Sequence, residues 1–415
     1  MRRRTLAGLL PLVAAFAVGG GCGGGEDGDG KQSADGDKSR QELLDSIDTR
    51  PRDVDDSDDQ IKRLLADREA AIEQRDGKAM AATARGAQRA RDRRAGRNLA
   101  GLPLADVRLN PLDVQVAGRK ATIRTRMRYR IQGATREFET ARKIVARKSP
   151  AGWQVVRDTS PEALPWEVQR YKATRSRHIV LLTPPGIDPG ALVPGLERAY
   201  RRISRDLPAR DLPDRVQVLA ATDGDEVEAL GVKGLASNVV AMADVRRQFK
   251  PGTALEVQRV LAQRMTLIMD RYDLMPVQER EQTLAHEMVH TALGPDTSGR
   301  VPQWLVEGLA LYVSREDLSA YTGAVEAAGV RPSLRQLSKE GAIGKLGADA
   351  KSAAYVIASA AAHEIVARKG NEGLFRLFEA FNDSTIGGPP GPRTTDKVMR
   401  KSVGLSLDEL DAAIG

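Results

Sequence analysis

Cysteine, histidine and aromatic residues are all scarce in this chain, and each shortage limits what the protein can be. Among 415 residues there is one cysteine, so no disulfide forms within the chain and its domains depend on packing. Aromatic residues make up 4% of the sequence, hydrophobic residues 41% and charged residues 29%. This balance is typical of a soluble globular protein and argues against a membrane protein with several spans.

Long apolar runs are missing as well. The run near the N-terminus extends over 13 residues, from Leu6 to Val18, whereas a membrane-spanning helix needs roughly 20. A cationic start precedes it and small residues follow, which is typical of a secretory signal. The next residues, VGGGC, resemble a bacterial lipobox, although Gly19 stands where that pattern prefers leucine. The resemblance implies a lipoprotein signal peptide at 1–22 and an extracytoplasmic protein anchored to the cell membrane by lipidated Cys22. An ordinary signal peptide and an uncleaved anchor are the alternatives.

The length of the chain exceeds what one hydrophobic core usually organises, so at least two domains are expected. Residues 23–41 are glycine-rich and polar without apolar periodicity, which predicts a flexible linker. A later stretch, TSPEALPWEVQ, is marked by prolines, and the pattern of apolar residues changes beyond it. We therefore expect one domain at 42–172 and a second at 174–415.

The first expected domain begins with apolar residues at helical spacing from Asp58 onward, interrupted near Gly77. In residues 121–131 apolar residues alternate with four arginines, which is the pattern of a half-buried strand. The next strand follows a short turn, and residues 152–158 form a third strand. A helix followed by such an antiparallel sheet resembles the NTF2-like group. Because no catalytic motif accompanies it, the resemblance implies an accessory or binding module.

The arginine stripe on this sheet has two interpretations. A net charge of +8, a pI near 9.6 and a row of arginines are compatible with nucleic-acid binding. A two-residue hairpin turn at 132–133, however, places acidic residues opposite the arginines: Glu137 opposite Arg128 and Glu139 opposite Arg126. That pairing predicts a solvated, salt-bridged sheet face, so we expect no nucleic-acid partner.

The second expected domain alternates strands with a helix and then becomes helical. An amphipathic pattern predicts a helix at 192–207, and after residue 300 every readable segment is helical. The expected fold class is α+β, with a helix and curved antiparallel sheet first, then a small mixed sheet and a mainly helical subdomain. Apolar runs predict the strands of the mixed sheet at 177–183, 215–221, 238–245 and 264–270.

The segment TLAHEMVHTALG, residues 283–294, contains two of the four histidines of the chain. His286 and His290 are four residues apart, so on a helix both imidazoles lie on one face and can reach one metal ion. Composition predicts on the order of 0.002 HExxH motifs in a chain this poor in histidine, so chance is a poor explanation. A first turn near Pro276, followed by apolar residues, predicts the helix that the motif requires.

A catalytic zinc site takes three protein ligands and keeps one position open. The next candidate ligand is Glu307 in RVPQWLVEGLALYVS, where Pro302 is well placed to begin a second helix. Other ligands are absent nearby in the sequence, because His178 and His363 are distant and Asp296 lies in an expected turn. A second helix that crosses the first would present Glu307 to both histidines.

HExxH together with the downstream WLVEG resembles the gluzincin zinc metallopeptidases of the peptidase-MA-like superfamily, over roughly residues 174–385. The resemblance implies a zincin-type domain in which His286, His290 and Glu307 bind Zn²⁺. It also implies that Glu287 is the general base, which accepts a proton from water and returns it to the leaving amine.

Several other residues of this region were considered for the site. Related enzymes often add a tyrosine or histidine that stabilises the oxyanion, and Tyr355 is a candidate, with Tyr312 and Tyr321 as competitors. A plain packed aromatic is the alternative for Tyr355. Trp304 is expected to pack, and His363 is expected to lie on a helix surface.

The strand at 264–270 directly precedes the motif helix. In enzymes of this type, the sheet edge beside that helix holds an extended peptide through main-chain hydrogen bonds. Residues 264–270 are one candidate for that edge, and a strand inside the core is the alternative.

The leading hypothesis is a secreted, lipid-anchored zinc metallopeptidase that hydrolyses peptide or protein substrates with metal-activated water. The alternative is a tethered envelope binding protein, in which the N-terminal module captures a ligand and the zinc site is inactive or structural. The two differ in one property, because only the peptidase needs an open coordination position and the carboxylate of Glu287.

Overall fold

The computed structural model describes residues 54–208, 212–232, 235–250, 256–318, 331–339, 341–383 and 391–415. The expected signal peptide at 1–22, Cys22, the linker at 23–41 and Tyr321 lie outside these residues. Within the described part of the chain, no helix combines the length and the apolar character needed to cross a membrane.

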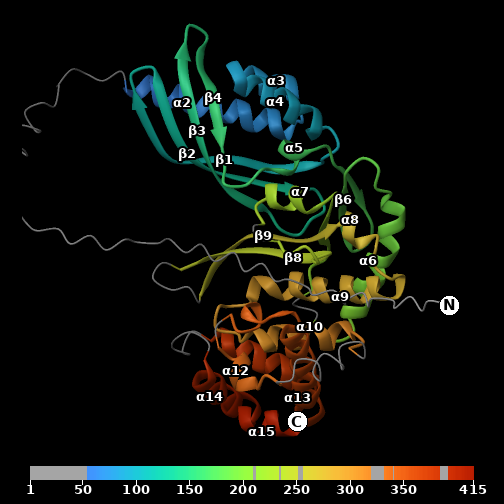
Figure 1. Cartoon of the computed structure of the whole chain (residues 1–415). Coiled ribbons are helices and arrows are strands. Elements are labelled where there is room, and N and C mark those ends of the chain that lie inside the picture. The colour runs from blue at the N-terminus through green and yellow to red at the C-terminus, as the bar shows by residue number, and fades with distance from the viewer. Residues whose placement is uncertain are drawn as a thin grey trace, which may run out of the picture.

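The described chain forms three successive parts of an elongated molecule (Figure 1). Helices and a four-stranded antiparallel sheet come first, a five-stranded mixed sheet lies in the middle, and the C-terminal region is helical. The α+β class expected from the sequence is therefore confirmed. The division into domains at 172–174 stays a prediction.

Three helices pack against one side of the first sheet, and the helical region breaks where the sequence predicts. Asp76 caps the second helix by accepting hydrogen bonds from the backbone N–H groups of Lys78 and Ala79. The next residue, Gly77, lies so close to Gly96 that a Cβ atom on Gly77 would be 2.5 Å from the Gly96 Cα atom. The first part consists of α2 (Val54–Glu73), α3 (Gly77–Ala82), α4 (Gly86–Leu99), β1 (Leu104–Ala117), β2 (Lys120–Ile131), β3 (Phe138–Ser149) and β4 (Gly152–Thr159).

Strand β1 has no counterpart in the sequence-based expectation. It is an edge strand with Pro111 in its interior, and its pairing with β2 is irregular at two places, between 105 and 108 and between 111 and 113. These irregularities break the period of two by which a strand is recognised in a sequence.

The predicted register of the β2–β3 hairpin is wrong by two residues. Arg128 pairs with Glu139 rather than with residue 137, because the connection runs over 132–137 and buries Ala134. The salt-bridged face is nevertheless confirmed. The carboxylate of Glu139 lies 2.8 Å from Arg128 Nε and 3.3 Å from Arg126 Nε.

The mixed sheet has the strand order β5-β6-β7-β9-β8, with β6, β7 and β9 parallel and both edge strands antiparallel. The candidate peptide-binding edge at 264–270 is therefore wrong, because residues 264–268 belong to β9, which lies between β7 and β8, and a short helix begins at Met269. The alternative of a core strand is confirmed, and β8 is the edge strand. The bounds are β5 (Lys172–Arg175), β6 (Ile179–Thr183), β7 (Val216–Ala221), β8 (Ala241–Phe249) and β9 (Val257–Ile268).

The two faces of the mixed sheet are covered differently (Figure 1). The first part of the molecule packs on one face, where Leu182, Leu219 and Met242 join its apolar core. Charged contacts tie the same two parts together, including the ion pairs Arg259–Glu139 and Arg246–Glu162. Apolar contacts and ion pairs thus hold the N-terminal module against one face of the mixed sheet.

Helices cover the opposite face of the sheet and form one continuous apolar core with it. Helix α6 begins after Asp188, whose carboxylate accepts a hydrogen bond from the backbone N–H of Gly190, and it lies beside α9. The helices of this region are α6 (Pro189–Ile203), α8 (Met269–Tyr272), α9 (Val277–Leu293), α10 (Gln303–Ser314), α12 (Leu334–Leu337), α13 (Ala348–Asn382), α14 (Pro392–Val403) and α15 (Leu407–Ala413). Short helices elsewhere are α5 (Pro165–Val168), α7 (Gly224–Ala229), η2 (Gly294–Asp296) and η4 (Ile343–Lys345).

Candidate metal centre

Helix α9 carries the HExxH motif and is enclosed by the rest of the protein. It starts after Pro276, as the sequence predicts, and every residue from 284 to 293 is buried. His286, Glu287 and His290 are 3%, 1% and 3% exposed. Polar side chains this deeply buried are costly unless hydrogen bonds, opposite charges or a metal ion compensate them.

The structure brings the three predicted ligands together. Helix α10 packs against α9 and places Glu307 Oε2 at 3.5 Å from His286 Nε2 and 3.3 Å from His290 Nε2. The two Nε2 atoms are 3.0 Å apart. These three atoms face a common point, and they form the one group in the described residues with the spacing of a metal site.

The donor set at this point fits a zinc ion. Oε2 of Glu307 is buried, and its approach to the two rings lacks the geometry of a hydrogen bond. A cation shared by all three atoms would satisfy this oxygen and both nitrogens together. Two imidazole nitrogens and one carboxylate oxygen are the ligands that catalytic zinc sites use.

Glu287 lies beside this group and is held by the edge of the sheet. Its Oε2 atom accepts a hydrogen bond of 2.9 Å from the backbone N–H of Ala243, whereas its Oε1 atom is buried and accepts no hydrogen bond within the described structure. The backbone N–H of Ile268 donates a hydrogen bond to the carbonyl of Val240. Because hydrogen-bonded positions alternate along an antiparallel pair, the even-numbered residues at this end of β8 bond to β9. Ala243 therefore turns its N–H to the free edge, where Glu287 meets it.

A further carboxylate, Glu316, reaches the same group and was missed by the sequence analysis. Its Oε2 atom lies 3.0 Å from Nδ1 of His286, the ring nitrogen on the side away from Glu307, without the geometry of a hydrogen bond. Glu316 follows the end of α10, where Arg315 adopts the left-handed conformation with φ 54° and ψ 46°. An ion pair with Asp206 at 2.8 Å holds Arg315 in this uncommon state. Nothing in SREDLS marks Glu316, because the contact depends on how the chain turns after the helix.

The glycine of WLVEG allows the helix that carries Glu307 to pack closely. A Cβ atom on Gly308 would lie 2.3 Å from the carbonyl oxygen of Ala358 on α13. Helices α10 and α13 therefore approach each other at a distance that no other residue permits. This contact fixes the position of α10, and with it the carboxylate of Glu307.

The protonation of the group reflects crowded carboxylates in a buried space. Burial raises the pKa of Glu287, His286 lowers it and the charge of Glu307 raises it, and the net result is a pKa of about 8. Burial also opposes the charge of Glu307, but His290 and His286 outweigh it and lower the pKa of Glu307 to about 2. Burial likewise disfavours the charged form of His286, yet Glu307 and Glu316 raise the pKa of His286 well above its usual value. The site thus attracts positive charge.

The remaining candidates from the sequence occupy other places. Trp304 is fully buried and donates to Ser338 Oγ at 3.0 Å, so the expectation that it packs is confirmed. His363 is exposed on α13, and its ring lies 5.2 Å from that of Tyr312, which confirms a helix-surface position. Tyr355 is 6% exposed in the apolar core beside α10. Its role toward an oxyanion stays a prediction.

Two further expectations about ligands are confirmed. His178 is far from the HExxH motif in the sequence. Its Nδ1 atom lies 2.8 Å from Oε2 of Glu197, and its ring stacks on that of Tyr200. Asp296 ends the short turn η2 that follows α9. Neither residue belongs to the metal group.

Comparisons with known proteins find distant structural likenesses. No protein-family model and no curated protein sequence matches the chain. A variant of an M1 zinc metallopeptidase from Deinococcus radiodurans is 15% identical with a TM-score of 0.36, over 76% of this chain and 61% of that one. A variant of this enzyme bound to a Tyr-Ser-Ala substrate gives 16% and 0.34, over 65% and 58%. The chain thus spans about three fifths of that enzyme.

A further likeness covers a smaller share of the chain. An NTF2-like protein with a cystatin-like fold from Novosphingobium aromaticivorans is 20% identical with a TM-score of 0.22. The likeness covers 30% of this chain and 85% of that one. Similarities this distant assign neither a family nor an activity, so the chemistry of the site rests on its own geometry.

Replacing Gly308 tests the packing that positions Glu307. The Gly308→Ala methyl group would collide with the Ala358 carbonyl, so we expect a loss of about 1–3 kcal/mol in the free energy of unfolding. Denaturant titration measures this loss. Gly344→Ala is the matched control, because a Cβ atom there meets nothing within 4 Å. Equal stability of the two variants would contradict the close contact.

Proposed function

We propose that this chain is a zinc metallopeptidase that hydrolyses peptide bonds at the group formed by His286, His290 and Glu307. The observation that supports the proposal is the convergence of two imidazole nitrogens and one carboxylate oxygen at one buried point. A ligand set of two histidines and one glutamate is typical of catalytic zinc sites, whereas structural sites usually fill all four positions with cysteine and histidine.

The three ligands would hold the ion, and their surroundings favour it. The carboxylates of Glu307 and Glu316 contact the pair of imidazoles, with Glu287 beside them. A divalent cation at this point would take the place of the protons that the raised pKa values of His286 and Glu287 indicate. When bound, zinc lowers the pKa of a water ligand to about 7 and polarises a substrate carbonyl.

Glu287 has the geometry of a general base. The backbone N–H of Ala243 fixes Oε2, so the carboxylate keeps one orientation and Oε1 stays available. We assign Oε1 the task of accepting a proton from the attacking water and delivering it to the leaving amine. Because Ala243 is part of the sheet edge, the strand that positions the base is also the strand nearest the site.

The substrate that this arrangement favours is a peptide or protein in extended form. Like Ala243, residues 241 and 245 of β8 turn their main-chain groups to the free edge of the sheet. An extended peptide can add to such an edge through main-chain hydrogen bonds, which do not depend on its sequence. We therefore assign to β8 the peptide binding that the sequence suggested for residues 264–270.

We further propose that the protein acts outside the cytoplasm, anchored to the bacterial membrane by lipid on Cys22. Support comes from the cationic start, the apolar run of 13 residues and the lipobox-like VGGGC. A glycine-rich linker at 23–41 would hold the folded parts away from the membrane. The paired arginines of the first sheet favour the absence of a nucleic-acid partner.

Substitutions at the centre separate catalysis from metal binding. We expect Glu287→Gln to retain zinc while peptidase activity falls about 10²–10⁴-fold, because only proton transfer is lost. His286→Ala removes a ligand and should lose the zinc, which metal analysis measures. Glu279→Gln, on the exposed first turn of α9, is the control and should keep both properties.

The same experiment decides between the two functional hypotheses. If wild-type protein holds one zinc ion and cleaves no member of a broad peptide library, the centre is inactive or structural. The tethered binding protein then replaces the peptidase. If wild-type protein binds no zinc, both hypotheses lose their metal centre.

Glu316 is expected to act through His286. Its carboxylate would fix the orientation and the Nδ1 proton of that ring, so Glu316→Ala should weaken zinc binding about 10–100-fold. Glu316→Gln keeps an oxygen acceptor and should lose less. Competition with a chelator at fixed pH measures the affinity, and Glu364→Ala on α13 serves as control. An unchanged affinity in Glu316→Ala would show that the contact has no such role.

Cell fractionation tests the anchor. In a bacterial host, wild-type protein should be found in the membrane fraction with an acylated N-terminal cysteine, identified by mass spectrometry. Cys22→Ala should release the protein into the soluble fraction or leave its signal uncleaved. A wild-type protein that begins at another residue and lacks acyl groups would exclude the lipoprotein interpretation.

A further inference from the structure

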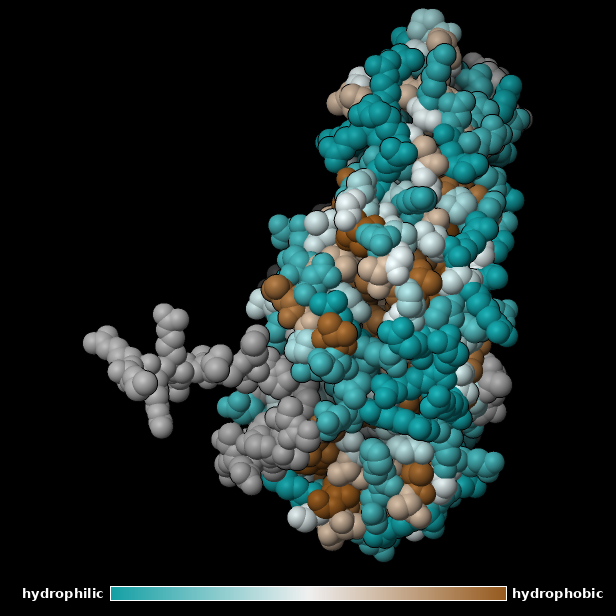
Figure 2. Space-filling view, turned by 90° about the vertical axis from the view of Figure 1, so that its right-hand side faces the viewer, coloured by the Kyte–Doolittle hydropathy of each residue, from teal (hydrophilic) through white to brown (hydrophobic). Residues whose placement is uncertain are grey.

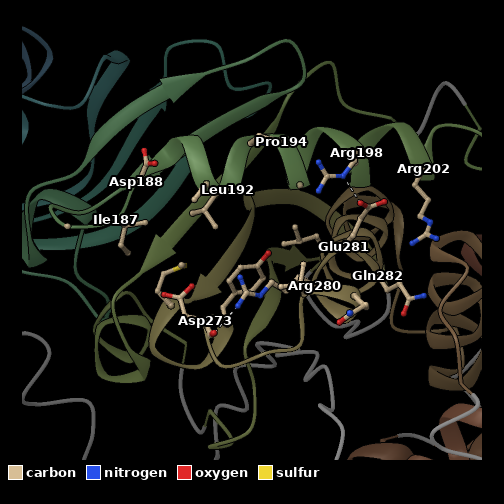
Figure 3. Close-up of a pocket in the computed structure, with 18 residues that line it drawn as sticks. Ile187, Asp188, Leu192, Pro194, Arg198, Arg202, Asp273, Arg280, Glu281 and Gln282 are labelled. Carbon is tan, nitrogen blue, oxygen red and sulfur yellow. Dashed lines mark hydrogen bonds and ion pairs between the residues drawn. The ribbon is translucent and has the colours of Figure 1, made fainter.

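A cavity lies outside the candidate metal centre formed by His286, His290 and Glu307. Its volume is about 560 Å³, and it lies between helix α6 and the corner where α8 leads into α9 (Figure 3). Volumes of this size are typical of sites for small molecules or short peptides. None of the proposed metal ligands lines it, although its wall includes the first two turns of α9.

The two ends of this groove carry opposite charges. Figure 3 shows Asp188 and Asp273 at one end and Arg198 and Arg202 at the other. Apolar side chains of the groove, including Leu192, lie between them. A ligand that lies along the groove meets two carboxylates and the guanidinium of Arg280 beside Asp273, then apolar surface, then Arg202 and the paired Arg198 and Glu281.

Two charged groups of the groove make no ion pair within the described part of the chain. Arg198 is paired with Glu281 at 2.7 Å, but Arg202 makes no ion pair within the described part of the chain. The carboxylate of Asp273 is likewise without an ion pair there. Tyr272 also lines the groove, and the guanidinium carbon of Arg280 lies 5.3 Å from the centroid of its ring.

Two exposed apolar residues lie at the rim of the groove. Val277 lines it and is 72% exposed, and nearby Leu274 is 83% exposed. Figure 2 views the side of the molecule that carries α6 and the α8–α9 corner, and it shows apolar side chains at the surface midway along the length. Apolar residues exposed beside a groove are typical of a binding surface.

The distance between the charged ends selects the length of the ligand. Asp188 and Arg198 are ten residues apart along α6, and Asp188 and Arg202 are fourteen apart. At a rise of 1.5 Å per residue these separations are about 15 and 21 Å. An extended peptide gains about 3.3 Å per residue, so roughly five to six residues bridge the ends. A free amino acid is far too short.

We propose that this groove binds short peptides with free termini, about five residues long, with an apolar residue in the middle. The terminal ammonium lies at Asp188 and Asp273, the terminal carboxylate lies at Arg202, and the apolar side chain contacts Leu192. Anionic lipid fits less well, because the acidic end of the groove would repel its headgroup. Binding needs neither zinc nor catalysis, so the inference goes beyond the proposed peptidase and stands independently of it.

Blocked peptides test the proposal directly. The full chain carrying Glu287→Gln, which prevents hydrolysis, is titrated with Ala-Ala-Leu-Ala-Ala in four forms: free, N-acetylated, C-amidated and doubly blocked. Each block removes one charge-assisted contact, so calorimetry should show about tenfold weaker binding per block. Free leucine should not compete.

Substitutions in the groove locate the binding site. Arg202→Gln should abolish the effect of C-amidation while that of N-acetylation remains. Arg201→Gln is the matched control, because this exposed neighbour on α6 does not line the groove. Gly195→Leu should remove binding by filling the groove, since a Cβ atom there points to Leu284 at an ordinary contact distance of 3.5 Å. Circular dichroism checks that this helix substitution leaves the fold intact.

Four results would overturn the inference. They are the absence of binding by any peptide, equal binding of all four forms, binding that survives Gly195→Leu, and binding that disappears in His286→Ala. The last result would place the peptide at the metal centre, which supports the proposed peptidase and removes the groove as a site. Vesicles of anionic phospholipid that bind through Arg202 while free peptides do not would assign the groove to a membrane surface.

Discussion

The contact between Glu307 and the two imidazoles of α9 is the constraint on which the rest of the structure depends. Placing carboxylates and imidazoles in a space without water is costly unless their charges compensate one another or a cation joins them. Helix α9 is enclosed by the rest of the protein. Because its histidines are buried, α10 must approach closely enough for Glu307 to reach both rings. Gly308 permits the packing of α13 that fixes α10, and Glu316 reaches the far side of His286.

The two faces of the mixed sheet contact different parts of the molecule. Its helical face and its edge strand β8 build the candidate metal centre, because Ala243 holds Glu287 from the edge while α9 supplies the two histidines. Its other face carries the N-terminal module through apolar contacts and ion pairs such as Arg259–Glu139. The module is thus packed on the face of the sheet that lies opposite the proposed catalytic group.

The sequence was most informative where the interactions are local. The spacing of His286 and His290 and the proline before each helix predicted the ligand-bearing face and the helix starts. It was least informative about pairing between strands. The connection at 132–137 is longer than predicted, so the hairpin register differs by two residues. Strand β1, which contains Pro111, was not predicted, and the edge strand beside the motif helix is β8 rather than β9. Apolar periodicity reports which face of a strand is buried, but it does not report which strand lies beside it.

The amino-acid sequence by itself determined the chemical identity of the centre, because residues one helical turn apart share a face whatever surrounds them. It also indicated Glu307, through a motif whose parts are close in the chain. Tertiary structure alone decided that Ala243 orients Glu287, that Asp206 stabilises the turn presenting Glu316, and that α6 and α9 enclose a groove with opposite charges at its ends. These contacts join residues far apart in the chain, and packing, which no local pattern encodes, sets their distances.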